Sequence, residues 1–170
     1  MSFTIRPALP ADVAGILAVE LDAGRVSATG SGPFAANMTA AMVDPARLVL
    51  VAEAQDDTTA AGGSGVVGWA KTHYWDHGDG PAPTGHYLGG VTVRPGFRRR
   101  GVAVELTQAR LEWVWERAEG AWYVVNARNE ASLALHRRWG FTEVARGAAF
   151  HAVTFDGGEG VLLRAARPSD

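Results

Sequence analysis

Basic residues surround a short glycine-containing stretch in the middle of the chain. Arg98, Arg99 and Arg100 directly precede Gly101, and Arg94 lies a few positions earlier. Residues 88–93 before them are rich in β-branched side chains, and the proline that follows ends this predicted strand because it cannot donate a ladder hydrogen bond. From about residue 100 the apolar side chains recur every three to four positions, which predicts a helix with a wide buried face.

The junction between this strand and this helix is suited to binding an anion. The first backbone N–H groups of a helix have no acceptor within the helix, and the aligned peptide dipoles make that end positive. Gly101 and Ala103 leave room for a phosphate to approach the backbone, and the arginines add positive charge around it. At this junction, residues 93–103, neither the Gly-Lys-Ser/Thr ending of the ATPase phosphate loop nor the Gly-x-Gly-x-x-Gly dinucleotide motif is present.

Two stretches together resemble the signatures of a known superfamily. Arg98-x-x-Gly101-x-Ala103, directly after a Val-Thr-Val-Arg-Pro segment, resembles the acetyl-CoA-binding motif of the GNAT superfamily of N-acetyltransferases. The stretch from Asn129 to Phe141 resembles the other signature of that superfamily, in which an asparagine opens a short helix and Gly-Phe closes it. This segment departs from the pattern at one position, where a histidine replaces the usual tyrosine, and that version looks like the phosphinothricin-type branch.

The resemblance implies acetyl transfer from acetyl-CoA to a primary amine, on a small molecule or a peptide, by direct attack without an acyl-enzyme. The absence of cysteine and of a Gly-x-Ser-x-Gly elbow agrees with this route. A backbone N–H near Val91 would then stabilise the oxyanion. The resemblance also implies a set of cofactor-binding residues, which comprises Val91, Thr92, Val93, Arg98, Arg99, Arg100, Gly101, Val102, Ala103, Asn129 and Ser132.

The groups that would move protons are less completely defined. His136, in the position of the usual tyrosine, is the candidate acid for the departing thiolate, because imidazole titrates near neutral pH. Many members carry a glutamate near the start of the strand where this chain has two glycines. The base is therefore unassigned, and an acceptor amine of low pKa would need none. The candidates for a base are His86, Asp76, His77 and Glu20.

Several of these residues have a purely structural interpretation as well. Asn129 suits a helix N-cap with or without a cofactor contact, and a histidine within a helix is usually a core or surface residue. The chain has no cysteine and only five scattered histidines, so we expect no metal site. The lost tyrosine and glutamate motivate an alternative function, a non-catalytic acyl-CoA-binding sensor or interaction module.

Length and composition set the remaining expectations. The 170 residues suit a single GNAT-like domain over residues 1–170. A net charge of −2 argues against nucleic-acid and anionic-membrane partners. Without cysteines, without an apolar run long enough to span a bilayer and without a leader segment, the chain is predicted to be cytoplasmic. Members of the superfamily often form homodimers, and no feature of the sequence decides this point.

The pattern along the chain predicts an α/β (α+β) fold, a mixed and mostly antiparallel sheet of six to seven strands with helices on both faces, of the acetyl-CoA N-acyltransferase type. Residues 24–33 and 76–85 are expected to be loops, and residues 55–64 an exposed hairpin connection. The regions 24–33 and 147–155 are the expected walls of the acceptor site. The predicted strands are residues 3–7, 47–54, 65–75, 87–93, 122–126, 141–146 and 161–166, and the predicted helices begin near residues 10, 34, 100 and 130.

Overall fold

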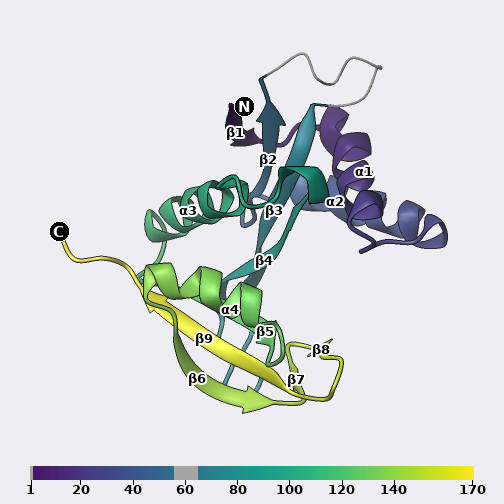
Figure 1. The fold of residues 1–170 in the computed structure, drawn as a ribbon. Coiled ribbons are helices and arrows are strands. Elements are labelled where there is room, and N and C mark those ends of the chain that lie inside the picture. Colours follow the sequence, from purple (N-terminus) through teal and green to yellow (C-terminus); the bar gives the residue numbers. More distant parts are fainter. Residues whose placement is uncertain (1, 56–64) are drawn as a thin grey trace. The chain divides into compact units, whose positions relative to one another are not determined.

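A computed structural model describes residues 2–55 and 65–170 of the chain (Figure 1). Seven strands form one sheet in the order β1-β2-β3-β4-β5-β9-β6. β4 and β5 are parallel, whereas the pairs β1–β2, β2–β3, β5–β9 and β6–β9 are antiparallel. The mixed, mostly antiparallel sheet that the sequence predicts is therefore confirmed. The strands are β1 (Phe3–Pro7), β2 (Val49–Ala54), β3 (Val66–Trp75), β4 (Gly85–Val93), β5 (Gly120–Asn126), β6 (Thr142–Gly147) and β9 (Gly160–Ala166).

The chain divides into two compact units. The first comprises Met1–Thr72 and Gly90–Arg110, and the second comprises His73–Gly89 and Leu111–Asp170. β3, β4 and α3 each run from one unit into the other, and the expectation of a single domain over residues 1–170 stays a prediction. The helices are α1 (Val13–Asp22), α2 (Ser31–Val43), α3 (Val102–Trp115) and α4 (Glu130–His136), with short 3-10 turns η1 (Pro10–Asp12), η2 (Ala28–Gly30), η4 (Pro95–Phe97) and η5 (Arg137–Trp139).

In the first unit, β2 supplies side chains to two apolar clusters on opposite faces of the sheet. Val49 and Val51 belong to a cluster with residues of α1 and α2, including the fully buried Ile16. Leu50, the residue between them, belongs to a second cluster that includes Leu106 of α3. Successive side chains of a strand point to opposite faces, so this alternation lets β2 pack against helices on both sides.

An ion-pair network fixes the start of α1 in the same unit. The guanidinium of Arg6 donates to both carboxylate oxygens of Asp12, at 2.7 and 2.9 Å, and to Glu53 at 3.0 Å. Asp12 also accepts the backbone N–H of Leu9 at 2.7 Å. The bonds from Arg6 hold the pKa of Asp12 below its ordinary value, so the carboxylate that fixes this turn stays ionised.

In the second unit, β5 has the same two-sided character. Ala121, Tyr123 and Val125 join an apolar cluster with the end of α3, while Trp122 packs with the opposite cluster around Phe150. β9 pairs with β5 along seven residues and with β6 on its other side, and Figure 1 shows β9 in yellow between them. β5 and β9 therefore form the buried centre of this unit.

Two parts of the structure differ from the sequence prediction. The second helix begins at Ser31 rather than Phe34, and a 3-10 turn precedes it inside the expected loop 24–33. Pro33 lies in the first turn of this helix, where the missing N–H costs nothing, so proline did not mark the end of a loop. Residues 56–64 of the expected hairpin connection 55–64 lie outside the described residues.

The second difference is a small hairpin within the region 147–155, formed by β7 (Ala149–Phe150) and β8 (Val153–Thr154). Its turn holds His151 and Ala152 at left-handed φ angles of 48° and 64°, a backbone conformation that residues other than glycine seldom adopt. Tertiary contacts hold His151 there: its backbone N–H donates to Asp79 at 2.7 Å, and its ring stacks on Trp75 at 4.5 Å.

Within the described part of the chain, no helix is both long and apolar enough to cross a bilayer. The predicted cytoplasmic location stays a prediction.

Candidate active site

The strand, loop and helix that the sequence singled out are present in the first unit. β4 ends at Val93, the 3-10 turn η4 spans Pro95–Phe97, and α3 begins at Val102. The backbone N–H of Glu105 donates to the carbonyl of Gly101 at 3.0 Å, and this is the first bond of the helix. The N–H groups that come before Glu105 in this turn therefore have no acceptor within the helix.

Gly101 has the backbone conformation that this loop needs. Its φ of 86° is left-handed, and a Cβ added there would meet no atom within 4 Å. Arg99 is also left-handed, with a φ of 60°. Glycine adopts such angles without a steric cost, so Gly101 both shapes the turn and leaves open space beside the helix N-terminus. These two properties are what a backbone cradle for a phosphate group requires.

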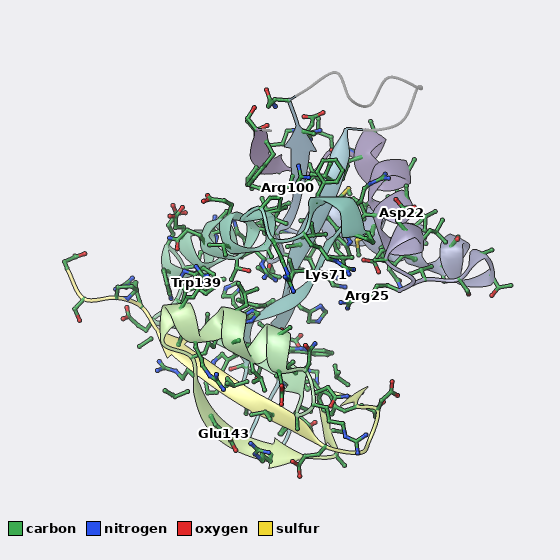
Figure 2. All side chains as sticks on the ribbon, in the orientation of Figure 1. Asp22, Arg25, Lys71, Arg100, Trp139 and Glu143 are labelled. Atoms are coloured by element: carbon green, nitrogen blue, oxygen red, sulfur yellow. The ribbon has the colours of Figure 1, made fainter. Side chains whose placement is uncertain are left out.

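The three consecutive arginines are all exposed, but they have different local contacts. Arg98 donates through Nε to the carbonyl of Val93 at 3.3 Å, which ties the loop back to β4. The guanidinium of Arg100 lies 5.6 Å from the centre of the Phe97 ring, and Figure 2 shows this residue at the N-terminal end of α3. Arg94 belongs to the scaffold, because it pairs with Asp22 at 2.6 Å.

β4 supplies the other predicted cofactor residues of the first unit. Thr92 and Val93 are buried, and Val91 is half-buried and packs with an apolar cluster. Any contact that these residues make with a ligand would therefore come mainly from the backbone. The parallel pairing of β4 with β5 consists of Tyr87 with Trp122 and Leu88 with Tyr123, both within the second unit.

In the second unit, Asn129 caps the short helix α4. Its Oδ1 accepts the backbone N–H of Ser132 at 3.1 Å, and its carbonyl accepts the N–H of Leu133 at 3.1 Å. At the other end Gly140 adopts a φ of 74°, and the Phe141 that follows is buried. The N-cap role that the sequence suggested for Asn129 is thus present, and the left-handed Gly140 is typical of the residue that ends a helix.

His136 lies in the core of the second unit, with 1% of its surface exposed. Its Nδ1 bonds to the carbonyl of Ser132 at 2.7 Å, and because a carbonyl can only accept, the proton is on Nδ1. Its ring stacks on Tyr123 with centroids 3.8 Å apart. With the proton on Nδ1, the other ring nitrogen can donate a hydrogen bond only in the doubly protonated imidazolium.

Tyr123 is the residue of this cluster that the sequence analysis did not name. Its hydroxyl hydrogen-bonds to the hydroxyl of Ser132, so Tyr123, Ser132 and His136 form one connected group. Tyr123 is buried whereas Ser132 is half-buried, which makes the Ser132 hydroxyl the most accessible polar group of the three. Tyr123 lies in a strand whose residues 121–125 are all apolar, and no local pattern separates it from a tyrosine of the core.

The four candidate bases occupy different environments. Glu20, in the first unit, is buried and accepts from the indole of Trp69 at 2.7 Å. In the second unit, the exposed side chains of Asp76 and His77 are hydrogen-bonded at 2.8 Å, and the bond from His77 lowers the pKa of Asp76. Each of these three side chains therefore already has a hydrogen-bond partner.

His86 is the exception among the candidate bases. It is 9% exposed and packs between the rings of Tyr74 and Trp113, at 4.8 and 5.4 Å. Its buried Nδ1 has no hydrogen-bond partner among the described residues. Burial, aided by the charge of Arg117, lowers the pKa of His86 below 6.5. His86 is thus neutral at physiological pH.

Among the described residues, no group of three or more histidine, cysteine, aspartate or glutamate side chains could hold a metal ion.

Comparison with known proteins gives consistent results. Residues 21–141 match the description of the Acetyltransferase (GNAT) family. A search of curated proteins finds no match. Two solved structures are similar at a TM-score of 0.70: the ribosomal-protein-S18-alanine N-acetyltransferase from Escherichia coli, at 18% identity over 97% of this chain and 94% of that one, and Arabidopsis thaliana NAA60 in complex with acetyl-CoA, at 16% identity over 97% and 98%.

At these identities the two structures show a shared fold. The family match covers most of the chain and contains both signature segments, the loop before α3 and the segment around α4. The chain therefore belongs to the GNAT family of acetyltransferases.

Proposed function

We propose that this protein is an acetyl-CoA-dependent N-acetyltransferase that acetylates a primary amine, on a small molecule or a peptide, by direct attack and without an acyl-enzyme. Acetyl-CoA would supply the activated acetyl group as a thioester. The residues of the chain then have three tasks, which are to bind the diphosphate, to stabilise the charge that develops during transfer and to handle two protons.

The observation that carries the proposal is the conformation of Gly101. A left-handed glycine with open space at its Cβ position lies directly before the first turn of α3. Bare N–H groups and the positive end of the helix dipole favour an anion at such a place. Exposed Arg98, Arg99 and Arg100 add positive charge around it. Gly101, Val102 and Ala103 would bind the diphosphate through the backbone, and Val91, Thr92 and Val93 would hold the pantetheine arm in the same way.

Ser132, Tyr123 and His136 would act together at the sulfur. In this proposal the Ser132 hydroxyl donates a hydrogen bond to the departing thiolate, and the Tyr123 hydroxyl bonded to it supports that donation. His136 holds the ring of Tyr123 by stacking and the backbone of Ser132 by its Nδ1 bond. This assigns the proton donation to the two hydroxyls and gives His136, the acid expected from the sequence, a positioning role.

His86 would accept the proton of the incoming amine, directly or through a water molecule. An alkyl ammonium has a pKa near 10.4, so reaching the neutral amine at pH 7 costs roughly 4–5 kcal/mol. A neutral imidazole whose Nδ1 lacks a partner among the described residues is suited to take that proton. The other candidate bases are already engaged in hydrogen bonds.

The competing proposal is a module that binds acyl-CoA without catalysis. One experiment separates the two: the protein is incubated with acetyl-CoA and a panel of primary amines while thiol release is followed, and CoA binding is measured by calorimetry. Release that depends on an amine supports the enzyme. Tight CoA binding with no release on any amine of the panel supports the binding module instead.

A further inference from the structure

A polar pocket of about 400 Å³ lies within the second unit, beyond the end of β5. Its lining includes Arg128 and Asp156, and also Arg146 and Glu159. This volume is within the range of small-molecule sites. Arg128 directly precedes Asn129, the cap of α4, so the pocket adjoins the helix that carries Ser132 and His136.

The side chain of Asn126 fixes two walls of this pocket relative to each other. Its Oδ1 accepts the backbone N–H of Arg128 at 3.0 Å, and its Nδ2 donates to the backbone carbonyl of Asp156 at 2.8 Å. One amide therefore joins the segment after β5 to the turn before β9. The backbones that carry Arg128 and Asp156 are held in place before any ligand arrives.

Gly157 makes room for the guanidinium of Arg128. Its φ is 88°, and a Cβ built there would lie 2.6 Å from the guanidinium carbon of Arg128 and 2.8 Å from its Nη1. The contact involves the charged far end of the Arg128 side chain. A larger residue at position 157 would have to move this guanidinium from its present position. The turn thus has a conformation that glycine favours and a surface on which an arginine head group rests.

The charges of the pocket are only partly neutralised by the protein. Arg146 is fully engaged, with bonds of 2.6 and 3.1 Å to Glu143 and one of 3.0 Å to Glu159. Within the described part of the chain, the guanidinium of Arg128 and the carboxylate of Asp156 have no ion pair or hydrogen bond. The pocket therefore presents one available cation and one available anion. A ligand that satisfies both carries a carboxylate and a positively charged amine.

We propose that this pocket recognises the acceptor, and that the acceptor is a primary amine that also bears a carboxylate, as an amino acid does. Arg128 binds the carboxylate through its planar fork of N–H donors, and Asp156 attracts the amine in its ammonium form. This assignment rests on the proposed acetyltransferase function. It makes Arg128 the residue that distinguishes an amino acid from the corresponding amine without a carboxylate.

The test uses matched acceptors, namely several α-amino acids and the amines formed by removing their carboxyl group. Thiol release from acetyl-CoA is measured with the wild-type protein, Arg128→Ala, Arg128→Lys and, as a control, Arg138→Ala, an exposed arginine of η5 that does not line the pocket. Binding of the same compounds to each protein is measured by calorimetry without acetyl-CoA, and thermal unfolding checks that each variant is folded.

We expect the wild type to prefer amino acids, and Arg128→Ala to raise their KM at least 10-fold with a smaller change in kcat. The same variant should leave the amines without a carboxylate unaffected, Arg128→Lys should recover part of the loss, and Arg138→Ala should behave as the wild type. Gly157→Ala, which displaces the guanidinium, should reproduce the loss.

Equal use of both members of each pair, or an unchanged KM in a folded Arg128→Ala, would overturn the inference while amine-dependent thiol release still supports the enzyme. No release on any amine contradicts the proposed function. In that case calorimetry alone decides whether the pocket recognises amino acids. Binding of amino acids that depends on Arg128 would support this recognition, and the absence of such binding would reject it.

Discussion

The loop Arg98–Ala103 in the first unit and the segment Asn129–His136 in the second carry the two signatures of the family, but they are built in opposite ways. Arg98 to Gly101 of the loop are exposed, two of these residues are left-handed, and the first backbone N–H groups of α3 follow directly. The helical segment is capped by Asn129, and its polar side chains bond to its own backbone and to the hydroxyl of Tyr123 in β5. The first arrangement suits the binding of a charged group, and the second suits holding a few hydroxyls in one geometry. Variants in the two regions should therefore separate affinity from turnover.

The largest effect is expected at Gly101. Gly101→Glu places a carboxylate in the open space beside the helix N-terminus and forces a left-handed angle on a residue with a Cβ. We expect the affinity for acetyl-CoA, measured by calorimetry, to fall roughly 100-fold, which corresponds to about 2.7 kcal/mol. Gly101→Ala is the matched control, because it introduces the backbone strain without the charge. Equal losses of affinity in the two variants would assign the effect to backbone strain. An unchanged affinity in Gly101→Glu would show that the diphosphate does not bind at this loop.

The next effect concerns the helical segment. Tyr123→Phe keeps the ring that stacks on His136 and removes only the hydroxyl bonded to Ser132. We expect kcat to fall about 30-fold, somewhat less than the roughly 10²–10⁴-fold usual for proton-transfer catalysis, while acetyl-CoA affinity changes little. Ser132→Ala should lower kcat similarly.

Tyr87→Phe is the control for this prediction, since it removes a tyrosine hydroxyl that bonds to the carbonyl of Pro83 instead. It should cost about 1 kcal/mol of stability and leave kcat unchanged.

His136→Ala tests the positioning role, because it should lower kcat with little change in acetyl-CoA affinity and also lower the melting temperature. A wild-type kcat in a folded His136→Ala would contradict the positioning role, and a wild-type kcat in Tyr123→Phe would show that the hydroxyl pair takes no part in proton donation.

A third prediction uses the pH dependence of His86. Burial lowers the pKa of His86 below its ordinary value of 6.5, so the neutral base persists to lower pH and the acidic limb of the kcat/KM profile should lie below pH 6.5. His86→Phe keeps an aromatic ring between Tyr74 and Trp113 and should lower turnover about 10-fold. An acidic limb that persists unchanged in His86→Phe would assign that limb to another group.

The same shift has a consequence for stability. The folded state binds a proton at His86 less readily than the unfolded state, so the free energy of unfolding should fall as the pH is lowered below 6.5. This fall should be smaller in His86→Phe, and urea unfolding at several pH values measures it.

The smallest effect is expected from the exposed arginines of the loop. Arg99→Gln and Arg100→Gln each remove one positive charge near the expected diphosphate, and surface charges contribute little individually because water and salt screen them. We expect a two- to fivefold loss of acetyl-CoA affinity at low salt that shrinks as salt is added. A loss of affinity that does not depend on salt would indicate a direct, desolvated contact. The arginines would then bind the diphosphate directly, as is proposed for the backbone at Gly101.

Much of the fold follows from local patterns. β1 has the predicted bounds, and the order of residue types along the chain already contains the apolar run of β5 and the periodicity of α3. The prediction is less complete where tertiary contacts hold unusual backbone. The hairpin β7–β8 has non-glycine residues at left-handed angles that contacts of His151 with Asp79 and Trp75 maintain. No local propensity favours that turn, so it could not be read from the sequence.

The sequence by itself determined the family, the glycine and arginines of the loop before α3, and the segment that contains Ser132 and His136, because each depends on residues that are close together in the chain. Only the tertiary structure decided that His136 is buried, that Tyr123 is bonded to Ser132 and that the Nδ1 of His86 lies buried without a partner among the described residues. These properties depend on contacts between side chains of different elements, and such contacts produce no periodic pattern along the sequence.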